Sequence, residues 1–109
     1  MTRAGTRDRW IVRRPNPVFS PEYRALVGVL TAARQEGGLS QAALALRLGR
    51  AKSHISRIEQ GQRRVDSLEL VRIAYALRMA PEELFTRILD ALREAGLPES
   101  ATPLPRPSQ

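Results

Sequence analysis

The sequence predicts an all-α fold of five short helices, and three observations lead to this expectation. Apolar residues recur at spacings of three and four through the middle of the chain, which is the period of a helix with one buried face. The chain shows no strand pattern and no internal repeat. Glycines and prolines fall between the periodic segments, where they end one helix or begin the next. Helices this short need a shared core, so the 109 residues are expected to form one domain.

Start and stop signals divide the middle of the chain into these helices. Ser20 followed by Pro21 is a typical helix start, and Gly37-Gly38 and Gly49 are typical helix ends. The expected helices span residues 21–36, 41–48, 51–60 and 67–78, and a fifth helix begins at Pro81 and ends at Gly96. Three regions follow from this pattern, namely an extended basic arm over residues 1–20, the helical domain over 21–96 and a disordered, proline-rich tail over 97–109.

Two of the expected helices flank Gly49 and form a helix-turn-helix pattern, whose second helix can enter the major groove of DNA. That second helix offers a series of hydrogen-bond donors, Lys52, Ser53, His54, Ser56 and Arg57. Arg57 is the candidate for a bidentate contact to guanine, with a phosphate contact or a solvated surface arginine as the alternatives. His54 is a candidate DNA contact, with a partly packed residue as the alternative. Arg50 and Ala51 stand where a capping side chain is expected, so a phosphate oxygen could satisfy the first amides.

The basic charge is concentrated in two segments. The chain has 18 basic and 11 acidic residues, a formal net charge of +7 and a pI near 11.4. Residues 1–20 contain five basic residues against one acidic residue, and residues 47–64 contain six against one. A basic chain of this kind suits a polyanionic partner such as DNA, and the alternative is a merely soluble basic protein. Because residues 47–64 include the second helix of the motif, the charge distribution favours DNA.

The composition excludes several classes of function. The chain has no cysteine and one histidine, which rules out a cysteine metal site, a thiolate nucleophile and a histidine pair. It also lacks a glycine-rich phosphate loop, so the sequence predicts no catalytic residue, no metal and no cofactor. No apolar run approaches the roughly 18 residues that span a membrane, and the N-terminus lacks a signal-peptide pattern. We therefore expect no membrane partner and a cytoplasmic, nucleoid-associated protein.

Several spaced motifs resemble the phage Cro/repressor (Xre) family of helix-turn-helix proteins. They are Ala33-Arg34-Gln35-Glu36, Gly38-Leu39-Ser40-Gln41, Leu48-Gly49, Ile55-Ser56-Arg57-Ile58-Glu59 with Gly61, Leu68-Glu69-Leu70, Ile73-Ala74, Ala76-Leu77 and Pro81-Glu82-Glu83-Leu84-Phe85. The resemblance covers about residues 23–86 and implies a compact five-helix, repressor-like domain that binds double-stranded DNA as a two-fold dimer. Leu46 stands where a polar residue is common in the family, so it is expected to be an exposed apolar side chain.

The resemblance also implies roles for individual positions. Lys52, Ser53 and Arg57 fall at positions that reach base edges, and Gln41 falls at a position that contacts the DNA backbone. Arg34 and Glu59 fall at positions that often form a partly buried ion pair. The complete set of candidates adds His54 to the base contacts and Arg50, Ser56, Gln60, Arg63 and Arg64 to the backbone contacts.

The predicted function is that of a sequence-specific transcriptional regulator, namely a repressor that binds an inverted repeat as a homodimer. The apolar residues of the fifth helix fit a core first, and the part beyond Phe85 suggests a dimer interface, with candidates Leu84, Ile88, Leu89 and Leu92. The alternative is an antitoxin that binds a protein partner as well as its own promoter. In that case the arm over residues 1–20 is the better candidate for the partner-binding segment.

Overall fold

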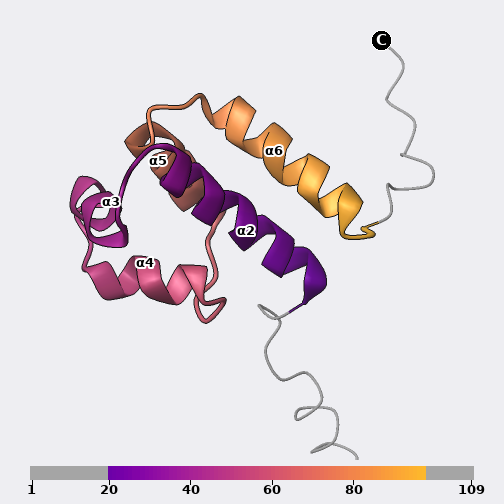
Figure 1. Ribbon diagram of the computed structural model, residues 1–109, viewed down its shortest axis with the longest axis horizontal. Coiled ribbons are helices and arrows are strands. Elements are labelled where there is room, and N and C mark those ends of the chain that lie inside the picture. Colours follow the sequence, from indigo (N-terminus) through magenta and orange to yellow (C-terminus); the bar gives the residue numbers. More distant parts are fainter. Residues whose placement is uncertain (1–19, 98–109) are drawn as a thin grey trace, which may run out of the picture.

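The computed structural model describes residues 20–97, which form five α-helices (Figure 1). They are α2 (Pro21–Glu36), α3 (Gln41–Leu48), α4 (Lys52–Glu59), α5 (Ser67–Ala76) and α6 (Pro81–Glu94). Because these residues contain no strand, the expected all-α class is confirmed. The expected arm up to residue 19 and the tail from residue 98 lie outside the described residues, and so does the partner-binding segment of the antitoxin alternative. None of the described helices has the length and apolar character needed to cross a membrane.

All five helices contribute to one aliphatic core. Helix α2 packs against both α6 and α4, and α3 packs against α4 and α5 (Figure 1). The buried core residues are Leu30, Ala33, Leu44, Ala45, Ile55, Ile58, Ile73, Ala74, Leu84 and Ile88. Helices α3 and α4 have eight residues each, too few to be stable alone in water. Their positions therefore depend on the helices that surround them.

Side-chain caps account for three of the helix starts. The side chains of Ser20, Ser40 and Asp66 accept hydrogen bonds from the amides of Tyr23, Ala43 and Glu69 respectively. Helix α4 is one residue shorter at each end than expected, because Ala51 and Gln60 serve as its caps. Helix α5 ends at Ala76 and not at Arg78, since Arg78 adopts a φ of 60°, which lies in the left-handed region and ends a helix.

The turn between α3 and α4 depends on Gly49. Its φ of 69° lies in the left-handed region, where a side chain other than hydrogen is strained. This conformation lets the amides of Gly49 and Arg50 bond to the carbonyls of Leu46 and Ala45, at 3.1 and 2.9 Å. These bonds satisfy the last carbonyls of α3 and set the direction in which the chain enters α4.

The structure corrects part of the expected dimer interface. Leu84 and Ile88 are each only 1% exposed and belong to the core of the domain, so they offer no surface to a second copy. Leu89 and Leu92 are half-buried, and Phe85 beside them is 54% exposed. On α3, Leu46 is exposed, as expected.

Candidate nucleic-acid interface

Five candidate residues of α4 and its C-cap lie on one side of the helix. They are Lys52, Ser53, Ser56, Arg57 and Gln60. Since successive residues of an α-helix are rotated by about 100°, these five share an arc of about 140°. All are exposed except Ser56, which is half-buried and accepts a hydrogen bond from the Gln60 amide at 3.1 Å. Ile55 and Ile58 point the opposite way into the core. Helix α4 therefore presents hydrogen-bonding groups outward while two isoleucines hold it to the domain.

The N-terminal end of α4 lacks a side-chain cap. Ala51 occupies the cap position with extended backbone angles and makes no side-chain cap bond. The amide of His54 bonds to the Ala51 carbonyl at 3.0 Å, and Arg50 is exposed just before the helix. A helix start of this kind combines unsatisfied amides with the positive end of the helix dipole, which together attract an oxyanion.

His54 lies apart from these outward-facing residues. Its Nε2 is 2.6 Å from Oε2 of Glu69 in α5, and both side chains are only 12% exposed. The imidazole is thus packed against α5 and hydrogen-bonded to a carboxylate, and it does not point outward with the other base-contact candidates. Asp66 and Glu69 stand three residues apart, which is the spacing of a capping box. The Asp66 half of that motif is present at 2.8 Å, whereas the Glu69 carboxylate binds the imidazole instead.

A buried ion pair joins α2 to the C-terminal end of α4. Arg34 Nε lies 2.6 Å from Glu59 Oε2, and Arg34 Nη2 lies 3.0 Å from Glu59 Oε1, so the guanidinium binds the carboxylate with two parallel bonds. Arg34 Nη1 also donates to the carbonyl of Leu39 at 2.7 Å. Gln41, at the start of α3, donates from Nε2 to Glu59 Oε1 at 2.9 Å. Gln41 thus helps to hold Glu59, and its Nε2 carries a second hydrogen that a further acceptor can use.

The loop after α4 is attached to α2 by Tyr23. The Tyr23 hydroxyl donates to the carbonyl of Arg63 at 3.3 Å and accepts from the amide of Val65 at 2.9 Å. The guanidinium carbon of Arg64 lies 5.3 Å from the centre of the Tyr23 ring, a cation–π distance. Burial raises the pKa of the Tyr23 hydroxyl, and the hydrogen bond from Val65 partly opposes this shift. Helical periodicity places Tyr23 on the buried side of α2, but it gives no indication of this contact with the loop.

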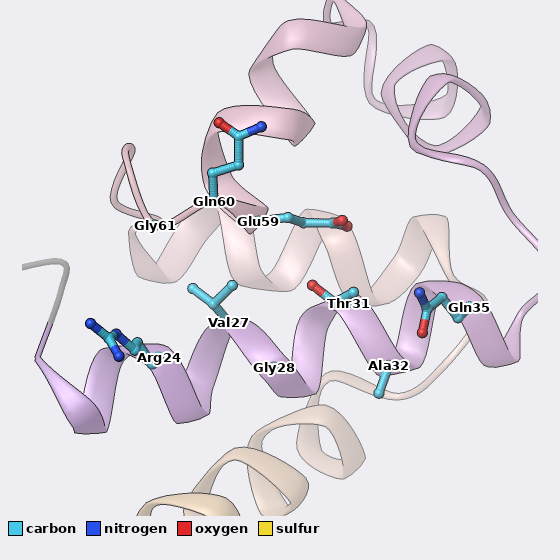
Figure 2. Close-up of a pocket in the computed structure, with 9 residues that line it drawn as sticks. All are labelled: Arg24, Val27, Gly28, Thr31, Ala32, Gln35, Glu59, Gln60 and Gly61. Atoms are coloured by element: carbon cyan, nitrogen blue, oxygen red, sulfur yellow. The ribbon is translucent and has the colours of Figure 1, made fainter.

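A groove of about 540 Å³ runs between α2 and the C-terminal end of α4 (Figure 2). Figure 2 shows Val27 and Thr31 on the side of α2 that faces Glu59 and Gly61. The carboxylate that lines the groove, that of Glu59, is already bound to Arg34 and Gln41. Among the described residues there is no cluster of three or more His, Asp or Glu that could hold a metal ion. The groove thus offers space beside α4, and the Glu59 carboxylate in its lining is already hydrogen-bonded.

Comparisons with known proteins agree with this geometry. Residues 25–86 match a family model described as a helix-turn-helix domain. Among solved structures, one similar protein is an XRE-family like protein from Pseudomonas syringae pv. tomato str. DC3000. The two chains are 33% identical, with a TM-score of 0.59, over 63% of this chain and 84% of that chain. No curated protein sequence matches. Both matches are to helix-turn-helix proteins, and the family match spans the α3–turn–α4 unit described above.

Proposed function

Because the chain belongs to the Xre family of helix-turn-helix DNA-binding domains, we propose that it is a sequence-specific transcriptional regulator, namely a repressor that binds an inverted repeat as a homodimer. Xre-family DNA-binding proteins are typically non-enzymatic. The observation that carries the proposal is the exposed polar arc of α4, with Lys52 and Arg57 directed away from the core. An α-helix fits the major groove, where each base pair presents a distinct pattern of donors and acceptors.

We assign base recognition to three exposed residues of α4. Arg57 binds guanine through its guanidinium, which matches the O6 and N7 acceptors in a bidentate manner. Lys52 and Ser53 stand in the first turn and reach the neighbouring base or its phosphate. In this assignment His54 is left out of the base contacts, since its imidazole is bound to Glu69.

The remaining candidates are assigned to the DNA backbone. They are Gln41, Arg50, Ser56, Gln60, Arg63 and Arg64. Support comes from their positions at the start of α3, around α4 and in the loop after α4. Gln41 and the uncapped start of α4 add amide donors suited to phosphate oxygens. Such contacts position the protein without reading sequence.

For the homodimer we propose the exposed side of α6. Phe85 lines an apolar groove of about 410 Å³ between α5 and α6, and Leu89 and Leu92 follow it along the helix. A two-fold interface places the same patch on both copies, so the Phe85 ring of each copy would enter the groove of the other. Two recognition helices related in this way would meet half-sites about 34–36 Å apart.

The test begins with genome-wide mapping of the DNA bound by the protein, which gives the site, its symmetry and the half-site spacing. Arg57→Ala should then lose affinity at particular base positions of the mapped site. The matched control Arg63→Ala should weaken mapped and random DNA alike and reduce the salt slope of log K by about one. If both variants bind mapped and random DNA as the parent does, the proposal is wrong.

A further inference from the structure

We propose that His54 and Glu69 form a clamp that sets the rotation of α4 about its own axis, so that His54 is a positioning residue for DNA recognition and not a DNA contact. This inference rests on the proposed function, because it concerns how α4 is aimed at the bases. The clamp joins the first turn of α4 to the first turn of α5 through a contact of 2.6 Å. Both side chains are largely shielded from water, where such a bond is stronger than at the surface.

The clamp stands opposite a second attachment of α4. With about 100° of rotation per residue, Ile55 and Ile58 mark the middle of the buried side, and His54 and Glu59 lie on its two edges. Glu59 is tied to α2 and α3 through Arg34 and Gln41, whereas His54 is tied to α5. A rotation of α4 in either direction therefore lengthens a hydrogen bond on one edge or the other.

The isoleucines alone do not set this rotation closely. Apolar burial is non-directional, so Ile55 and Ile58 stay buried over a range of helix rotations. Hydrogen bonds weaken steeply when their angle is lost, which makes the two edge contacts the directional restraints. The radius of a helix with side chains is about 5–6 Å, so a rotation of about 10° moves a side-chain tip by about 1 Å. Recognition of a base tolerates errors of about 0.5 Å in the position of the side chain. The contacts that fix the rotation of α4 are therefore needed to place the Arg57 guanidinium.

The chemistry of the pair identifies a conservative replacement. The imidazole Nε2–H donates to the Glu69 carboxylate in the protonated ring and also in the neutral Nε2–H tautomer. A glutamine at position 54 offers an amide N–H at a similar distance from the backbone, and so it retains the donor. An alanine or a leucine at position 54 removes the donor, and leucine keeps much of the buried volume.

The experiment compares binding of the full chain to the mapped site and to random DNA, with the ratio of the two affinities as the readout. His54→Ala and Glu69→Ala should each lower this ratio about tenfold, and the double variant should lower it no further, because both remove the same interaction. His54→Gln should keep the ratio within about threefold of the parent. The salt slope should stay unchanged in His54→Ala, since no phosphate contact is removed.

Other outcomes overturn the clamp. If His54→Ala lowers the ratio and Glu69→Ala does not, His54 is a DNA contact. If neither variant changes the ratio while Arg57→Ala does, the clamp is wrong and the proposed function stands. If the parent binds the mapped site no more tightly than random DNA, the clamp and the proposed function are both wrong. Circular dichroism checks folding at the assay temperature. Should His54→Ala unfold, His54→Leu replaces it, and a parent-like ratio in His54→Leu overturns the clamp.

Discussion

The buried ion pair between α2 and α4 is the interaction whose one-sided removal should damage the domain most. Arg34 and Glu59 are bound through two parallel hydrogen bonds, and their side chains are only 11% and 8% exposed. Replacing Arg34 by methionine keeps an unbranched side chain, although a shorter one, and removes the charge and the three hydrogen bonds that Arg34 donates. Glu59 then retains the Gln41 amide, and its carboxylate becomes a buried charge without a counter-charge beside it.

The expected cost of Arg34→Met follows from this geometry. Removing one partner of a buried ion pair typically costs about 3–5 kcal/mol, which is a large part of the roughly 5–15 kcal/mol that keeps a domain folded. At about 4–8 °C per kcal/mol for a domain of this size, the melting temperature should fall by about 12–40 °C. The double variant Arg34→Met/Glu59→Met contains no unpaired charge, so it should be more stable than Arg34→Met alone.

In the absence of DNA, urea unfolding followed by circular dichroism measures the change in free energy, and thermal unfolding measures the change in melting temperature. Arg87→Met is the matched control, because Arg87 also forms ion pairs, with Glu36 and Glu83, but at the surface. Surface ion pairs contribute little, so this control should unfold close to the parent. The reasoning is refuted if Arg34→Met unfolds at the same urea concentration as Arg87→Met. It is also refuted if the double variant is less stable than Arg34→Met.

Three further predictions concern stability and assembly. Burial raises the pKa of Tyr23, so its contribution to stability is fully present below about pH 10 and is lost as the pH rises through the higher folded value. When the free energy of unfolding in urea is measured across this pH range, Tyr23→Phe should lose less stability at alkaline pH than the parent. Tyr75→Phe, at an exposed tyrosine, should lose as much as the parent. The same pH dependence in both variants would contradict this prediction. Gly49→Ala should lower the free energy of unfolding by about 1–2 kcal/mol, because φ is 69° there, and an unchanged urea midpoint would oppose it. Leu84→Ala should lower the free energy of unfolding by about 2–5 kcal/mol, as measured by thermal unfolding. Phe85→Ala should change the unfolding little and shift the sedimentation equilibrium towards the monomer. A fully dimeric Phe85→Ala protein would exclude the proposed interface.

The helices could be predicted closely because their limits are encoded locally. Ser20, Ser40 and Asp66 each accept from an amide three residues later, as capping residues do. The end of α5 differs from the expectation because Arg78 takes a positive φ, and arginine, unlike glycine, gives no local indication of that conformation. The α6 interface was partly misassigned because helical period shows which residues share a face and not how much of that face the rest of the domain covers.

The candidate site was only partly predictable for a related reason. The helical period of α4 does place His54 next to Ile58, at the edge of the buried side, so a local indication of partial burial existed. Its partner was hidden, because the Asp66–Glu69 spacing pointed to a capping box and the orientation of α5 against α4 is a tertiary property. Tyr23 is similar, since its hydroxyl binds backbone groups about 40 residues away, at Arg63 and Val65.

These contacts explain why a domain with a two-helix DNA-binding motif needs three more helices. Helix α4 has eight residues, so its shape and direction must come from its surroundings. Its buried side is held by the core, one edge by Arg34 and Gln41 from α2 and α3, and the other edge by Glu69 from α5. Because these attachments occupy the buried side and both edges, the remaining arc of α4 can change in sequence without loss of the fold, as the proposed role in base recognition requires.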